Sequence, residues 1–158
     1  MTPTPSAGST TISTLIGAPV ASVAPDASLL DVADVLTEQG IGAVIVGDPD
    51  IPSGIVSERD VVIALADRCD PATTRAIDIA SATLIRCSAE ATVGEVAARM
   101  MERYVRHVLV TDEGRLVGII SARDLLGVYA TAAMEDDLAD ELRDFWSSST
   151  SPPQAPET

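Results

Sequence analysis

The chain has 158 residues, a formal net charge of −14, a single histidine and ten basic residues, all of them arginine. This balance excludes the broad basic face with which proteins bind DNA or RNA, although a few local arginines can still hold one phosphate. No segment has the ~20 consecutive apolar residues of a membrane span, and the start lacks the pattern of a signal peptide. We therefore expect a cytoplasmic protein with no nucleic-acid or membrane partner.

Cys69 and Cys87 are the only cysteines, and with one histidine they are too few for a Cys/His zinc site of the usual kind. We interpret them as buried or half-buried thiols, and a disulfide or redox switch is the alternative. No metal site is expected.

Residues 1–10 are rich in Thr, Ser and Pro and cannot offset their ordering entropy by burial, so we predict a mobile tail. The first folded unit, residues 11–66, opens with an extended run from Val20 to Val23. A helix comes next, with an N-cap at Ser28 and apolar residues at i, i+3, i+4 and i+7. Gly40 offers this helix a left-handed stop.

Two strands complete the sheet of this unit, around residues 43–46 and 54–56, joined by a turn of Gly, Asp and Pro. A helix opened by Ser57 closes the unit. The order of elements is therefore β-α-β-β-α. Residues 67–76 link the first unit to a second one.

Residues 77–130 repeat the same signals at a constant offset of 64 positions. Residues 17–62 and 81–126 align without a gap and share 13 identities in 46 pairs, where chance in so Ala- and Val-rich a chain gives roughly four. Tyr104 stands where the first repeat has its glycine stop, so we expect the second long helix to end differently. The chain contains two copies of one small unit.

A single copy is too small for a comfortable core of its own, so the two must share one. We predict an α/β (α+β) fold in which two β-α-β-β-α units pack sheet to sheet with pseudo-two-fold symmetry. An acidic helix over residues 131–146 continues the last element. Phe145 and Trp146 at its end indicate a docking contact with the body, a second chain or a protein partner. Residues 147–158 form a second mobile tail.

The strongest repeated phrase is Gly-Ile-Val-Ser-Glu-Arg-Asp at 54–60 and Gly-Ile-Ile-Ser-Ala-Arg-Asp at 118–124. A duplicated β-α-β-β-α unit with this ending resembles a pair of cystathionine-β-synthase (CBS) domains, the regulatory module also called a Bateman domain. The resemblance covers about residues 11–130. It implies a cleft between the units for an adenosyl ligand such as AMP, ADP, ATP, S-adenosylmethionine or NAD, and it implies a homodimer. An adenine nucleotide would act as a regulatory ligand, with no cofactor required.

The resemblance assigns ribose-binding acids to Asp60 and Asp124, and their hydroxyl partners to Ser57 and Ser121. A carboxylate can accept hydrogen bonds from both ribose hydroxyls. Ser-x-x-Asp is also a plain helix-capping pattern that needs no ligand, and this alternative stays open.

Four basic residues are candidates for phosphate binding. Arg59 and Arg123 stand beside the two aspartates, where capping does not require a cation. Arg106 and His107 precede an apolar strand in the second repeat, and the first repeat has small uncharged residues there. We therefore expect two unequal sites. A solvated Arg106 and a half-buried His107 without a ligand are the alternative.

Adenine contacts in such modules come from main-chain groups and aliphatic side chains of the first strand and the hairpin. The corresponding residues are Val20 and Leu84, together with Ala18, Thr83, Val44 and Val108.

Nothing in the sequence indicates catalysis. One histidine supports no Ser/His/acid or Cys/His arrangement, and the glycine spacing fits neither a P-loop nor a dinucleotide fingerprint. We expect a protein that is not an enzyme and has no catalytic residues. Two functions remain: a stand-alone regulator that binds an adenosyl ligand between its repeats and signals through a dimer, or a ligand-free dimerising scaffold.

Overall fold

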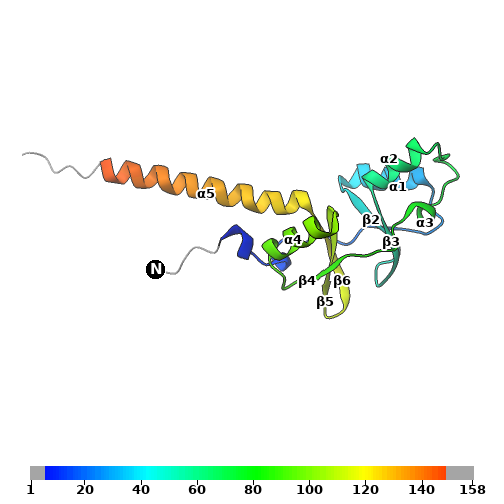
Figure 1. The fold of residues 1–158 in the computed structure, drawn as a ribbon, viewed down its shortest axis with the longest axis horizontal. Helices are drawn as coiled ribbons and strands as arrows, with labels where there is room; N and C mark the ends of the chain where they lie inside the picture. The colour runs from blue at the N-terminus through cyan, green and yellow to red at the C-terminus, as the bar shows by residue number, and fades with distance from the viewer. Residues whose placement is uncertain (1–5, 149–158) are drawn as a thin grey trace, which may run out of the picture.

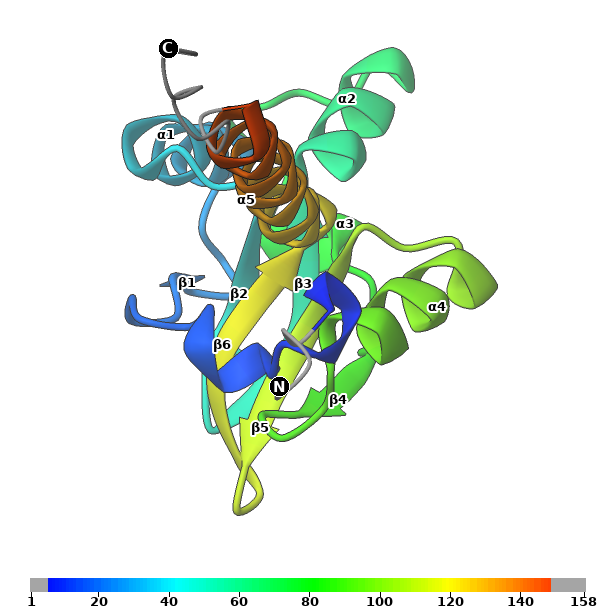
Figure 2. The same cartoon turned by 90° about the vertical axis from the view of Figure 1, so that its left-hand side faces the viewer.

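The computed structural model describes residues 6–148, except for the side chains of Leu142 and residues 145–148. Two three-stranded sheets form the body, in the orders β1-β2-β3 and β4-β5-β6. Figures 1 and 2 show the strands in the middle of the body, the helices around them, and one long helix that leaves it. The elements of the first repeat are β1 (Ser22–Val23), α1 (Leu29–Gln39), β2 (Ala43–Asp48), β3 (Ile51–Ser57) and α2 (Glu58–Ala66).

The second repeat has the same order, which confirms the predicted fold class. Its elements are α3 (Ala76–Ile79), β4 (Arg86–Ser88), α4 (Val93–Arg103), β5 (His107–Asp112), β6 (Arg115–Ser121) and α5 (Ala122–Ser148). In each sheet the first strand pairs in parallel with the second, and the second and third form an antiparallel hairpin. Two 3₁₀ helices precede the first repeat, η1 (Ala7–Ser9) and η2 (Ile12–Thr14).

The two long helices of the repeats begin and end in the same way. The hydroxyls of Ser28 and Thr92 cap α1 and α4, each in a capping box with the acid three residues on. Gly40 ends α1 with φ of 63°, and Tyr104 ends α4 with φ of 53°. Both are left-handed endings, so the prediction that the helix before Tyr104 stops differently was wrong.

Each sheet buries both of its faces. Val44 and Val46 of β2 pack in a cluster with α1, and Val108 and Val110 of β5 pack in a second cluster with α4. Side chains alternate along a strand, so the residues between these valines point to the opposite face. Those residues, Ile45 and Leu109, are at most 1% exposed. The sheets therefore pack face to face, with helices on their outer sides.

The segment before each repeat crosses over and pairs with the other repeat. The amide of Ile12 donates to the carbonyl of Ala91 at 2.9 Å, and the amide of Ala76 donates to that of Ala27 at 2.7 Å. These two bonds are related by the 64-residue offset. Two further pairs obey the same offset: Val93 to Thr10 with Leu29 to Thr74, and Ser13 to Ala89 with Ile77 to Pro25. The pseudo-two-fold symmetry therefore extends beyond the aligned residues.

Residues at the predicted ends of each unit pack against the other repeat. Residues 7–10, which we expected in a tail, form η1 and bond to the second repeat, and residues 74–76 of the expected linker bond to the first. Residues 1–5 and 149–158 lie outside the described residues, as do the side chains of Phe145 and Trp146 on which the docking prediction rests. None of the described helices is both long and apolar enough to cross a membrane.

Candidate functional site

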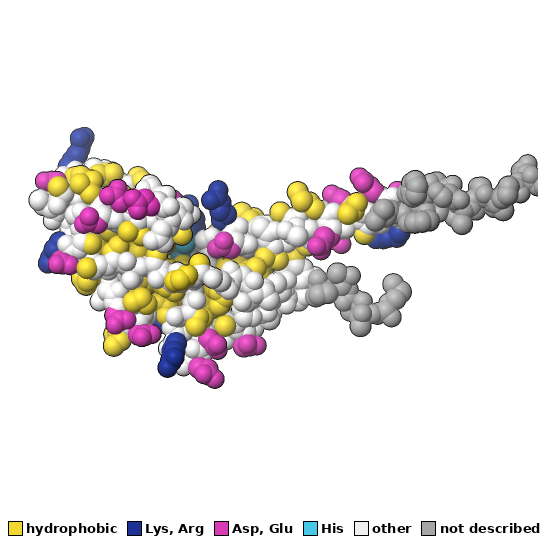
Figure 3. Space-filling model, turned by 180° about the vertical axis from the view of Figure 1, so that it is seen from behind, with side chains coloured by type: hydrophobic (Ala, Val, Ile, Leu, Met, Phe, Trp, Pro, Cys, Tyr) yellow, Lys and Arg dark blue, Asp and Glu magenta, His cyan; other side chains and the backbone are white. Residues whose placement is uncertain are grey.

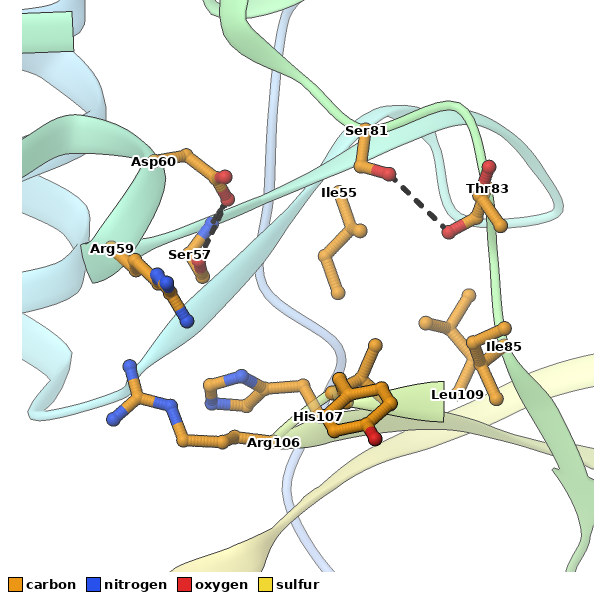
Figure 4. A pocket seen from close by; sticks show the side chains of 12 residues that line it. Ile55, Ser57, Arg59, Asp60, Ser81, Thr83, Ile85, Arg106, His107 and Leu109 are labelled. Atoms are coloured by element: carbon orange, nitrogen blue, oxygen red, sulfur yellow. Dashed lines mark hydrogen bonds between the residues drawn. The ribbon is translucent and has the colours of Figure 1, made fainter. Parts of the chain in front are cut away.

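A cavity of about 220 Å³ lies between the two repeats (Figure 4). One wall comes from the end of β3 and the start of α2, the segment that carries the repeated motif. The other wall comes from the segment that leads into β4, and from the end of α4 and the start of β5. The lining residues are Ile55, Ser57, Arg59 and Asp60 on the first wall, and Ser81, Thr83, Ile85, Tyr104, Val105, Arg106, His107 and Leu109 on the second.

Cationic groups from the two repeats converge at one end of this cavity. Figure 4 shows the side chains of Arg59 and Arg106 extending toward each other from opposite walls, with the ring of His107 beside them. Neither arginine forms an ion pair with any described residue. Two guanidinium groups without carboxylate partners suit the oxygens of one phosphate group.

Asp60 lies next to this cationic end and is held by the start of α2. Its Oδ2 accepts hydrogen bonds from the Ser57 amide at 2.7 Å and from the Ser57 hydroxyl at 2.6 Å. Its Oδ1 accepts none from the described residues. Helix capping therefore occupies one carboxylate oxygen and leaves the other able to accept a ligand hydroxyl.

Asp124 is held in the same way at the start of α5. Its Oδ2 accepts from the amide and the hydroxyl of Ser121, both at 2.7 Å. Asp124, Ser121 and Arg123 do not line the cavity between the repeats. The positions that would face them are occupied by Gly42 and Ala43 of the first repeat instead of an arginine and a histidine. The place beside the first motif is therefore cationic, and the equivalent place beside the second motif is uncharged.

His107 of the second repeat contacts the first repeat. Its ring packs on Gly42, where an added Cβ would lie 2.7 Å from Nε2. Burial lowers the pKa of His107, helped by the charge of Arg106, while three carboxylates act weakly in the opposite direction: Glu58, Asp124 and Asp60. The charges of both motif aspartates therefore act on one imidazole.

Of the predicted base-binding residues, only Thr83 lines the cavity. Thr83 and Ile85 line it, whereas Leu84 between them does not, and neither does Val20. The side chains of Val44 and Val108 are fully buried in the clusters on the helix-facing sides of the sheets, and neither residue lines the cavity.

Several lining residues were missed by sequence reasoning. Ser81 forms an antiparallel bridge with Ile55, with amide-to-carbonyl distances of 2.9 and 3.0 Å, so the entering chain extends the first sheet. Backbone pairing of this kind leaves no signal in the sequence. Tyr104 was noted only as a helix end, and its alignment with Gly40 was the available clue.

The two cysteines lie outside this cavity. Cys87 is buried and Cys69 half-buried, both as free thiols, and burial raises the pKa of Cys87. Among the described residues, no three His, Cys, Asp or Glu side chains are grouped as metal ligands would be.

The fold and cavity define a class of protein: two pseudo-symmetric α+β repeats with a cavity between them that polar and apolar side chains line. The family model for the CBS domain matches residues 12–67 and 76–131. The chain belongs to the CBS domain family.

Several known proteins and solved structures are similar to this chain. An uncharacterised protein of Methanopyrus kandleri is 34% identical over 119 residues, which are 72% of this chain and 61% of that protein. The crystal structure of a CBS-domain containing protein from Agrobacterium tumefaciens matches with a TM-score of 0.71 and 33% identity, over 76% of this chain and 93% of that one. A CBS domain protein from Pyrobaculum aerophilum, solved in complex with AMP, matches with a TM-score of 0.67 and 31% identity, over 77% and 98% of the two chains.

Proposed function

We propose that this protein is a stand-alone CBS-pair regulator that binds an adenine nucleotide between its repeats and signals through a homodimer. Its role is regulatory and not catalytic. In the bound state the phosphate lies between Arg59 and Arg106, next to His107, and the ribose hydroxyls bond to Asp60. The base reaches toward the uncharged end of the cavity, which Thr83 and Ile85 line.

The observation that carries this proposal is the convergence of two unpaired arginines from different repeats (Figure 4). Bringing like charges together costs free energy, which a bound anion would offset. The AMP complex of the Pyrobaculum relative supports an adenine nucleotide as that anion. The cationic end favours a phosphate-bearing ligand over an uncharged adenosyl compound.

Dimerisation is supported by apolar side chains exposed at equivalent positions of α2 and α5. Val62 and Leu65 of α2 are 64% and 48% exposed, and their counterparts Leu126 and Tyr129 of α5 are 67% and 41% exposed. Figure 3 shows further apolar side chains among the acidic ones along α5. Helix faces of this kind suit a second copy of the chain.

Thermal unfolding with AMP, ADP, ATP, NAD and S-adenosylmethionine tests the binding. A ligand at about a hundred times its Kd stabilises the native state by about 2.7 kcal/mol, which raises the melting temperature by several degrees in a domain of this size. We expect AMP to give this shift and Arg106→Ala to abolish it, since the substitution removes one of the two phosphate contacts. The free variant should unfold within about 1 kcal/mol of the wild type.

Arg123→Ala is the matched control, because Arg123 occupies the same motif position as Arg59 but lies outside the cavity. We expect it to keep the AMP shift. If no compound in the panel moves the melting curve of the wild type, the ligand-free scaffold is the better interpretation. That alternative is favoured by the capping bonds that already engage both motif aspartates.

A further inference from the structure

Tyr104 combines a strained backbone with a side chain that contributes almost nothing to the fold. Its φ of 53° lies in the left-handed region, which glycine adopts freely and which costs free energy for a residue with a Cβ. The side chain is 93% exposed and has no hydrogen bond to a described residue.

The first repeat shows that this backbone does not require a tyrosine. Gly40 has almost the same dihedral angles, φ 63° and ψ 35° against φ 53° and ψ 37°. The capping bonds also correspond, since the amide after each residue donates to the carbonyl five positions back, at 3.0 Å for Ile41 and 3.1 Å for Val105. Glycine would make this ending with less strain.

The side chain of Tyr104 must therefore serve something other than the helix end or the core. It lines the cavity between the repeats, on the wall that also carries Thr83 and Ile85. An exposed aromatic ring beside a ligand cavity suits the flat face of an aromatic base.

We infer that Tyr104 covers the cavity and stacks on the base of the bound nucleotide, acting as a specificity-determining residue. This inference rests on the proposed function. The equivalent place beside the second motif has only a glycine, so the stacking residue and the cationic pair belong to the same site. One of the two related halves is equipped for a complete nucleotide.

Calorimetric titration of the full chain with AMP and with ribose 5-phosphate tests this inference, because the second probe has the phosphate and sugar but no base. Tyr104→Gly should weaken AMP binding about ten-fold and leave ribose 5-phosphate binding unchanged, since only the stacked base loses a contact. Tyr104→Phe keeps the ring and should bind AMP like the wild type. The free Tyr104→Gly protein should melt no lower than the wild type, because glycine relieves the strain.

Gly40→Tyr is the reciprocal control. No atom lies within 4 Å of a Cβ added there, so this substitution adds only the left-handed strain, on the other repeat. It should lower the melting temperature by a few degrees and leave AMP affinity unchanged. If Tyr104→Gly binds AMP as tightly as the wild type, or loses ribose 5-phosphate to the same extent, the stacking role is wrong. If the wild type does not bind AMP, the proposed function fails together with it.

Discussion

At the scale of single residues, the protonation of His107 links the cavity to pH. Burial and Arg106 lower its pKa below the ordinary value of 6.5. The unfolded chain therefore takes up a proton at a higher pH than the folded protein does, and folding stability falls as the pH drops from 6.5 toward the lower folded value. We expect the melting temperature of the ligand-free protein to decrease over this window, and His107→Gln to flatten the decrease, as measured by thermal unfolding at a series of pH values.

The carboxylates with shifted pKa values affect folding stability in a lower pH range than His107 does. Hydrogen bonds in the caps of α1 and α4 lower the pKa values of Asp31 and Glu95, and the Arg75 guanidinium does so for Asp78. Their contributions are present above the ordinary carboxyl values and are lost as the pH falls below about 4. If His107→Gln keeps the wild-type slope of stability against pH just below pH 6.5, the role given to the imidazole is wrong.

The glycine at the start of each motif, Gly54 or Gly118, leaves room for a neighbouring segment of the chain. A Cβ on Gly54 would lie 2.8 Å from the Cβ of Ala80 and 3.0 Å from the carbonyl oxygen of Ser81. Gly118, its counterpart, meets the side chain of Ile16. In both copies the absence of a side chain allows the entering chain to lie directly on the sheet.

Gly54→Ala should therefore destabilise the protein by about 1–3 kcal/mol, because Ala80 and Ser81 are held by backbone bonds and have little room to move. Urea unfolding measures this loss. Gly17→Ala is the control, since no atom lies within 4 Å of its added Cβ and its backbone is not left-handed. It should unfold within about 0.5 kcal/mol of the wild type. Equal stability of the two variants would contradict the close approach at Gly54.

At the scale of elements, the sequence predicts the helices and turns, because these depend on local patterns of residues. The apolar spacing of α1 and α4, their capping residues and the turns of both hairpins are local signals, and the structure has these elements. The crossing of residues 10–13 and 74–77 was not predicted, because its bonds join backbone groups that are distant in the chain. Thr10 and Thr74 are its one identical pair, too little to extend the alignment.

The candidate site was predictable only where local sequence patterns indicate its residues. Repetition singled out Ser57, Arg59 and Asp60, and the asymmetry between repeats singled out Arg106 and His107. The structure lines one cavity with all five. The remaining lining residues depend on how one sheet faces the other, which no local pattern specifies. For Tyr104 the sequence offers only its alignment with Gly40, and the left-handed φ comes from the structure.

At the scale of the whole molecule, the exposed helix faces make a prediction about assembly. We expect sedimentation analysis to give a dimer for the wild type and a monomer for the double variant Val62→Arg/Leu126→Arg, because buried like charges would oppose association through α2 and α5. Ile51→Arg is the control, since Ile51 is 79% exposed at the tip of a hairpin, away from both helices. A monomeric wild type would contradict signalling through a dimer.

The length of α5 determines how far a movement at its start would carry its end. α5 has 27 residues and hence a length of about 40 Å, so a rotation of about 5° at its root would carry its far end about 3.5 Å. That root is the segment of Asp124, whose charge is felt by His107 at the cavity wall. A rotation of α5 at that segment, caused by binding at the wall, would therefore move the far end of the helix much further than its start.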